Sequence, residues 1–297
     1  MRRFSFVALS LFLLLPGAAP AVAQDAHPML VQVNDQLAAQ GAKVRVDYAE
    51  YITAAGGPEF GRIIYASNRG NKQLSAHWVP GDPRRGGAIP ISWINDLSEG
   101  DANGAPTADD TRMAIERGVA TWENVNCSVI PLEYFGSYDF DFGYVQYLLG
   151  FGGVAGWAAD VTHAGWLPGP FFDAIAPGGS SYILGVTFTF IWVDENGDPT
   201  DINSDGKSDV AFREIYYNNS FVWQIGGTFD VETIALHEFG HGLSQAHFGD
   251  IFRTPSNGKL HFSPRAVMNA AYSGVQQQLT GTDNGGHCSI WAAWPNQ

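Results

Sequence analysis

The sequence predicts an α+β fold, in which strands and helices are grouped along the chain. Three observations lead to this class. Residues 182–193 (YILGVTFTFIWV) form the strongest strand pattern, because apolar and β-branched residues fill the segment. Two segments, beginning near residues 108 and 230, have the caps and apolar spacing of amphipathic helices. The predicted order is strand, helix, several strands, helix and then a loop-rich tail.

Each element has its own local signal. Residues 30–40 have weak helical spacing, while 43–52 and 61–66 alternate as strands do. A strand is expected over 88–94, followed by a helix over 108–123 that Thr107 caps. Strands are also expected over 129–135, 144–149 and 212–217, with a Gly- and Pro-rich stretch over 150–180. Asp230 is the expected cap of the second helix.

The first 23 residues read as a secretory signal peptide. Arg2 and Arg3 precede an apolar stretch over 4–15, and Ala21-Val22-Ala23 resembles a cleavage site. A membrane anchor is the alternative, but the apolar stretch is shorter than the ~18 residues that a spanning helix needs. We therefore expect a secreted protein, extracellular or periplasmic, without a membrane segment after processing.

Residues 24–85 are expected to form a separate N-terminal region of unknown role, with a pro-region as one hypothesis. The turn-rich segment 79–87 marks its end, and Arg84-Arg85 inside it is either a processing site or part of a solvated loop. Residues 86–297 would then form the main domain.

Composition limits the partners. The chain has 297 residues, of which 45% are hydrophobic, so it can bury a sizeable core. Its formal net charge of −14 repels phosphate backbones, which makes nucleic acid a poor partner. We expect a monomer that acts on a protein or peptide. The only two cysteines, Cys127 and Cys288, predict one disulfide in an oxidising compartment, with two free buried thiols as the alternative.

The chemistry is concentrated in His237-Glu238-Phe239-Gly240-His241. Residues four apart share a helix face, so both imidazoles can reach one metal ion, and Glu238 can take a proton from water there. The alternative is a helix with two surface histidines and an ion-paired Glu238. No glutamate follows Glu238, which excludes a metalloprotease that takes its third ligand from a downstream Glu. The remaining candidates for the third ligand are His247, Asp250, His261, Asp283 and His287, of which His247 has the best spacing.

These residues resemble the metzincin metallopeptidases, and the matrixin branch in particular, over roughly residues 86–297. The shared features are the H-E-x-x-H helix, His247 beyond it, and Met268 with Tyr272 four residues later, which is similar to a Met-turn. The resemblance implies that His237, His241 and His247 bind zinc and that Glu238 is the general base. It also implies a twisted mixed sheet with two long helices, a small irregular C-terminal subdomain, and a substrate that pairs along 184–192 as an extra strand.

Two positions depart from the matrixin pattern. Ser244 stands where the family has a Gly that turns the chain, often with positive φ, and a Ser adopts that conformation at a cost. Ala270 stands where many matrixins have Pro. The Ser244 departure concerns the turn that places His247 at the predicted zinc site.

An acidic insert suggests a second metal. Asp201, Asn203 and Asp205-Gly206 match the start of an EF-hand-like calcium loop, and Asp209 could contribute a further oxygen. The twelfth position is Phe212 instead of Glu, so a solvated acidic hairpin is the alternative.

The function expected from the sequence is a secreted zinc metalloendopeptidase, with calcium as a candidate second ion. Two other functions stay open. One is a catalytically inactive binding protein on the metzincin scaffold, and the other is a calcium-stabilised adhesion module.

Overall fold

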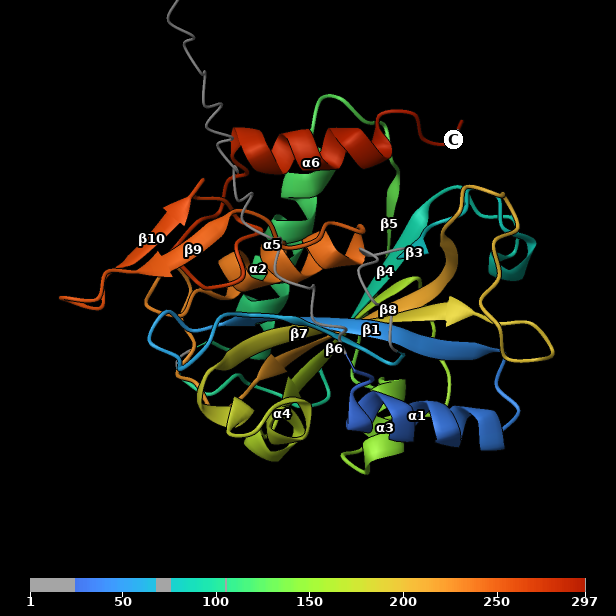
Figure 1. Ribbon diagram of the computed structural model, residues 1–297, viewed down its shortest axis with the longest axis horizontal. Helices are drawn as coiled ribbons and strands as arrows, with labels where there is room; N and C mark the ends of the chain where they lie inside the picture. The colour runs from blue at the N-terminus through green and yellow to red at the C-terminus, as the bar shows by residue number, and fades with distance from the viewer. Residues whose placement is uncertain (1–24, 68–75, 105, 297) are drawn as a thin grey trace, which may run out of the picture.

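The computed structural model describes residues 25–67, 76–104 and 106–296, and in these it has an α+β fold built on one mixed eight-stranded sheet (Figure 1). The predicted signal peptide lies outside the described residues. The helices are α1 (Pro28–Ala39), α2 (Ala108–Glu123), α3 (Tyr144–Leu149), α4 (Gly169–Ile175), α5 (Val231–Gly242) and α6 (Gly281–Trp291). The strands are β1 (Val44–Thr53), β2 (Ile63–Tyr65), β3 (Ala76–His77), β4 (Ile91–Asp96), β5 (Leu132–Tyr138), β6 (Val161–Leu167), β7 (Ile183–Trp192), β8 (Ser208–Asn218), β9 (Asp250–Arg253) and β10 (Leu260–Ser263).

The strands of the sheet follow the order β2-β1-β7-β8-β6-β4-β5, and β3 pairs with β8 outside this path. Strands β8, β6, β4 and β5 are parallel to one another. Strand β7 is antiparallel to both β8 and β1, and β2 continues the antiparallel part. The sheet is therefore mixed, with its antiparallel half at the end where β1 and β2 lie.

Helices cover both faces of the sheet. Helices α2 and α5 lie on one face, with α6 beyond them, whereas α1, α3 and α4 lie on the other (Figure 1). Two separate apolar cores result: one contains Trp122 and Phe239 and the other contains Leu30 and Phe171. Because both faces are buried, β7 and β8 consist almost entirely of buried residues, which explains the unbroken apolar run over 182–193.

Both long helices agree with their predictions, because their signals are local. Thr107 caps α2 through a capping box with Asp110, whose carboxylate accepts from the Thr107 N–H at 3.0 Å. The Asp230 carboxylate caps α5 by accepting from Thr233 N–H at 3.0 Å.

The N-terminal region is joined to the same sheet as the rest of the chain. Strand β1 pairs with β7 along nearly its full length, from Val44 opposite Trp192 to Thr53 opposite Ile183. The Arg84-Arg85 pair is held in place: Arg84 contacts Asp82 and Asp209, and Arg85 contacts Asp160 at 2.7 Å. The expected boundary near residue 85 is therefore a well-anchored turn within one sheet.

Two short segments differ from their predictions. Residues 144–149 form helix α3 instead of a strand, because their buried positions Tyr144, Val145 and Leu148 recur every three to four residues, and Gly150 ends the helix in the left-handed conformation. The Gly- and Pro-rich stretch 150–180 contains the buried strand β6 and helix α4. The tail contains the β9–β10 hairpin and α6, so it is less irregular than expected.

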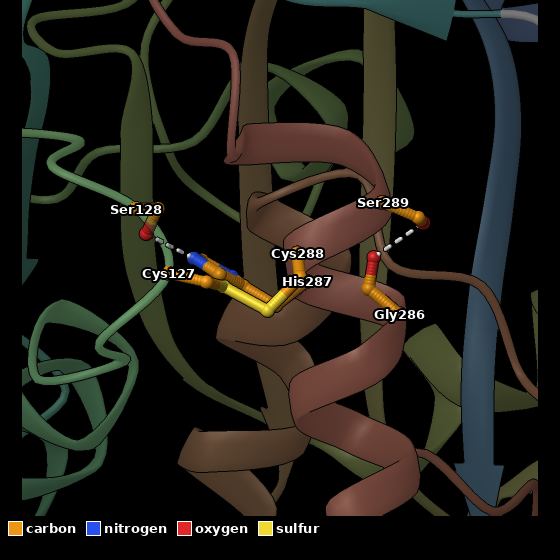
Figure 2. Close-up of a disulfide and its surroundings, with 6 residues drawn as sticks. All are labelled: Cys127, Ser128, Gly286, His287, Cys288 and Ser289. Carbon is orange, nitrogen blue, oxygen red and sulfur yellow. Dashed lines mark hydrogen bonds between the residues drawn. A yellow bond between two sulfur atoms is a disulfide. The ribbon is translucent and has the colours of Figure 1, made fainter.

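Cys127 and Cys288 form a disulfide, which confirms the predicted pairing. Figure 2 shows the bridge between the loop after α2 and helix α6, beside a 2.7 Å hydrogen bond between Ser128 Oγ and His287 Nε2. His287 stacks on Trp122 of α2, with ring centroids 5.5 Å apart. The disulfide therefore fastens α6 over the helical face of the sheet that carries α5.

Replacing both cysteines, Cys127→Ser with Cys288→Ser, should lower the free energy of unfolding by about 3–5 kcal/mol. The cysteines are 161 residues apart, and closing so long a loop restricts the unfolded chain strongly. Urea unfolding of the variant and the oxidised wild type measures the difference, with reduced wild type as the control. Equal unfolding midpoints would contradict the expected stabilisation.

In the described part of the chain, no helix combines the length and apolar character needed to cross a bilayer.

Candidate metal centre and catalytic residues

Helix α5, which carries the H-E-x-x-H residues, is entirely buried. Every residue from Val231 to Gly242 is buried, because the helix lies between α2 and the sheet. At its start, the Asp230 N–H donates to the Tyr272 hydroxyl at 3.2 Å. Both ends of the segment 230–272 are thus tied together at the helix N-terminus.

The structure brings the three predicted ligands together. The Nε2 atoms of His237, His241 and His247 lie 3.1 Å from one another in all three pairs. They form one of two clusters in the described residues that bring three metal-binding side chains within reach of one ion. After α5 the chain turns through residues 243–246, and this turn brings His247 back to the helix face.

Hydrogen bonds fix the protonation of two of the rings. His237 Nδ1 lies 2.7 Å from Val267 O, and His241 Nδ1 lies 2.7 Å from Gln245 O. Because carbonyl oxygens only accept, both Nδ1 atoms carry the proton and both Nε2 lone pairs face the common centre. Burial lowers the pKa of His237 and His247 well below the ordinary value, which keeps these rings neutral.

The residues present fit a zinc ion. A tetrahedral zinc with Zn–N bonds of about 2.0 Å separates its nitrogen ligands by about 3.3 Å, close to the spacing found here. Three imidazole Nε2 atoms that converge in this way can direct their lone pairs at one ion. Backbone carbonyls acting on Nδ1 are also the usual outer partners of zinc-binding histidines.

Glu238 lies beside this centre from the same helix. Its carboxylate accepts the Thr187 hydroxyl of β7 at 2.6 Å, while its Oε1 atom is buried and has no hydrogen bond of ordinary geometry. Burial raises the pKa of Glu238 to about 7. Gly185 leaves room for this carboxylate, because a Cβ there would lie 2.8 Å from Glu238 Oε1 and displace it. Strand β7 therefore both makes room for the carboxylate and holds it.

Met268 lies directly beneath the helix, as expected of a Met-turn. It is fully buried, and a Cβ on Gly240 would lie 2.4 Å from its sulfur, which explains the Gly inside the motif. The Asp283 carboxylate of α6 accepts from the N–H groups of Val267 and Met268 at 3.1 Å each. Helix α6 thus holds the turn whose Val267 carbonyl orients His237.

The other candidates for a third ligand lie elsewhere. Asp283 is engaged with the Met268 turn, His287 with Ser128 and His261 with Thr254. Asp250 is exposed at the start of β9. Among the five candidates, His247 alone reaches the centre.

Strand β1 covers the centre, and this cover was not predicted from the sequence. Burial lowers the pKa of His241, but the Glu50 carboxylate 3.2 Å from its Nδ1 atom, together with Glu238 and the Gln245 carbonyl, reverses this and raises the pKa overall. Thr53 bridges Ala271 in parallel, and the Tyr272 N–H donates to Thr53 O at 2.8 Å. His237, Glu238 and His241 are consequently fully buried. Strand β7 is therefore not the free edge that the resemblance implied, since β1 occupies the side away from β8.

The proposed calcium ligands are not gathered around one point. The Asp209 carboxylate pairs with Arg84 at 2.8 Å and accepts the Thr200 hydroxyl at 2.6 Å. The Asp201 carboxylate accepts from the N–H groups of Asp205 and Gly206, as in an ordinary polar turn. No described triad of metal-binding side chains includes Asp201, Asp205 or Asp209.

Calcium binding by the insert stays a prediction. A bound ion should raise the melting temperature of the wild type, because a ligand that binds only the native state stabilises it. Thermal melts with and without calcium, at fixed zinc, measure this, and Asp201→Ala with Asp205→Ala is the control. Equal shifts in both proteins would contradict the hypothesis.

A second acidic cluster lies outside all predictions. Asp96, Glu99 and Asp141 bring one carboxylate oxygen each within 4.8 Å of the others. Burial raises the pKa of Asp96 to about 6 and that of Glu99 to about 8. Asp141 is distant in the sequence from Asp96 and Glu99, so only the chain fold could reveal that the three carboxylates meet.

Two residues around the centre were not singled out beforehand. Glu50 had a signal, since it is an acid on an alternating strand at the same parity as the apolar Ile52. Thr187 had none, because its role depends on a contact with α5. Asp283 was considered only as a metal ligand, whereas its carboxylate holds the Met268 turn.

No protein-family model matches the chain, and the curated proteins contain no match to it. The fold and the centre therefore define an α+β protein in which three converging histidines that could hold a metal ion lie beside a buried carboxylate.

Proposed function

We propose that the protein is a secreted zinc-dependent endopeptidase, similar to the matrixin branch of the metzincins. One observation carries the proposal: three histidine Nε2 atoms converge 3.1 Å apart with Glu238 beside them on the same helix. The signal-peptide pattern over 1–23 and the Cys127–Cys288 disulfide support secretion.

The residues suit hydrolysis of a peptide bond. A zinc ion bound by the three histidines would supply a Lewis acid and make water a stronger nucleophile near neutral pH. Glu238 would take the proton of the attacking water and deliver it to the leaving amine, and a carboxyl group of pKa about 7 suits both steps. Thr187 holds this carboxylate in place, while Val267 and Gln245 orient two of the ligands.

The sheet supports the metzincin resemblance. It is mixed, and the long helices α2 and α5 lie together on one face (Figure 1). The Met268 side chain packs against Gly240 of the H-E-x-x-H helix. The chain also has features that the resemblance did not imply, namely strands β1 and β2 beyond β7 and three helices on the opposite face.

We further propose that residues 24–85 act as a pro-region in which β1 takes the place of substrate. Strand β1 pairs antiparallel with β7 on one side and meets residues 270–272 on the other. An extended peptide substrate would need the same main-chain partners. A hollow of about 730 Å³ near Tyr272, lined by the turn after β1 and by Phe229 and Phe262, could accept an apolar substrate side chain.

The second candidate is a secreted binding protein that retains the scaffold without catalysis. The burial of Glu238 and both helix histidines beneath β1 favours it, because a substrate cannot reach buried groups.

Metal analysis combined with a cleavage assay separates the two functions. The endopeptidase should contain one zinc per chain and cleave a quenched-fluorescence peptide library. Zinc-loaded, folded protein that cleaves nothing, even after β1 is released as described in the Discussion, would favour the binding protein.

A further inference from the structure

The turn after α5 is strained at one residue. Ser244 has φ of 63°, in the left-handed region that disfavours side chains. The turn is otherwise regular, since the Ser244 N–H donates to His241 O and the Gln245 N–H to Gly240 O, both at 2.9 Å. These two hydrogen bonds support the left-handed residue from within the turn, and a contact from outside the turn could hold Ser244 in this conformation as well.

Arg213 of β8 is placed to do so. Its Nη1 group donates to Gly242 O at 2.8 Å and lies 3.0 Å from Ser244 Oγ. The side chain is fully buried, yet no carboxylate of the described residues lies within ion-pair distance of it. A buried cation without an ionic partner is expensive, and the carbonyl end of α5 is the negative pole that it faces.

Two tryptophans complete the attachment of this helix end. Trp78 Nε1 donates to Gly242 O at 3.0 Å, and Trp291 Nε1 donates to Leu243 O at 2.8 Å. The carbonyls that the helix leaves without partners are thus satisfied by side chains from three distant segments.

His247 depends on this turn more than the other ligands depend on their surroundings. His237 and His241 are on the helix, and their Nδ1 atoms are held by carbonyl groups. Among the described residues, His247 has no such hydrogen bond from Nδ1, and its only polar ring contacts are with the other two ligands. The backbone conformation of residues 243–246 therefore decides where its Nε2 atom lies.

We propose that Arg213 and Ser244 are a positioning pair that places His247 for metal binding. The Ser244 hydroxyl bonds to Arg213 and so offsets the strain that a Gly would avoid. The charge of Arg213 meanwhile holds the end of α5. This inference rests on the proposed zinc site but concerns the turn itself, which can be examined without metal.

The first test compares Ser244→Gly with Ser244→Ala. Gly adopts positive φ without strain, so Ser244→Gly should bind zinc within a few-fold of the wild type. Ala retains the strain and loses the hydroxyl, so its zinc dissociation constant should rise by about tenfold or more, as for other outer partners of zinc ligands. Chelator competition measures both constants. Equal affinities of the two variants would overturn the proposal.

The second test removes the cation. Arg213→Met fills a similar volume, and its zinc affinity should fall about 10–100-fold. Adding Ser244→Gly to Arg213→Met should recover about tenfold of that loss, because the turn no longer needs the hydroxyl bond. When the same variants are loaded with cobalt in place of zinc, the visible absorption of the bound cobalt should rank their metal affinities in the same order. A double variant that binds no more tightly than Arg213→Met would overturn the proposal.

Hydrogen exchange of the metal-free proteins separates this inference from the proposed function. The amides of Ser244 and Gln245 should exchange faster in Arg213→Met and Ser244→Ala than in the wild type, while amides of β4 stay unchanged. Unchanged exchange at the turn would overturn the positioning role. Wild-type protein that shows the expected exchange pattern but binds no zinc would instead refute the endopeptidase.

Discussion

Replacing Glu238 by Gln should reduce peptide cleavage by about 10²–10⁴-fold while zinc content stays at one per chain, because general base catalysis is lost and the ligands remain. Gln has nearly the same size, and its Oε1 atom can still accept the Thr187 hydroxyl that now binds the carboxylate. The close approach of Gly185 leaves little freedom for another orientation. The folded structure should therefore survive, and only the proton acceptor is removed.

His247→Ala is the matched comparison. It should lower zinc occupancy and cleavage together, since it removes one of the three converging nitrogen atoms. Initial rates on the peptide library and zinc per chain are measured for both variants. Cleavage by Glu238→Gln within a few-fold of the wild-type rate would show that another group is the base. Stoichiometric zinc and a normal rate in His247→Ala would refute the ligand assignment.

The parts of this molecule that were predictable from sequence are those with local causes. The caps at Thr107 and Asp230 and the four-residue spacing of His237 and His241 each operate within one or two turns. The Cys127–Cys288 pairing followed because there were no other cysteines to choose from. Short apolar runs were harder, since periodicity alone does not separate a buried strand from a helix of six residues such as α3.

The remainder depends on contacts between distant segments. Nothing in residues 43–52 reveals that they pair with 183–192, and that pairing changes the site from an open cleft to a covered one. The same holds for Asp209, whose carboxylate pairs with Arg84 of the N-terminal region, and for Arg213, whose partners at the end of α5 are 29 and 31 residues away. Side-chain chemistry was predictable at the ligands, whereas access to them was not.

Locking β1 onto β7 should abolish peptide cleavage, and weakening its attachment should increase cleavage. Arg45 and Ile191 are directly opposite on the two antiparallel strands, a spacing that a disulfide can bridge. The pair Arg45→Cys with Ile191→Cys should form this bridge without touching the metal centre. Each single cysteine variant is the control for the substitution itself.

Val46→Ala provides the opposite change. Val46 is buried and lies opposite Phe190 of β7, so its truncation should weaken the seating of β1. A loss of about 1.4 kcal/mol in that seating raises the open fraction, and with it the cleavage rate, about tenfold. Val145→Ala in α3 is the matched control, because Val145 is equally buried in the same core but lies outside the N-terminal region. It should leave the rate nearly unchanged.

Initial rates on the peptide library, with peptide mapping to verify the new disulfide, distinguish the possible outcomes. Cleavage by the locked protein at the wild-type rate would refute the pro-region, since a substrate would then reach Glu238 with β1 in place. In another outcome, β7 of Val46→Ala exchanges hydrogen faster and the protein binds one zinc, but it still cleaves nothing. That result would leave the contact between β1 and β7 as proposed and would favour the binding protein. Because β1 occupies the main-chain partners that an extended peptide would need, we expect the locked protein to be inactive and Val46→Ala to be the faster enzyme.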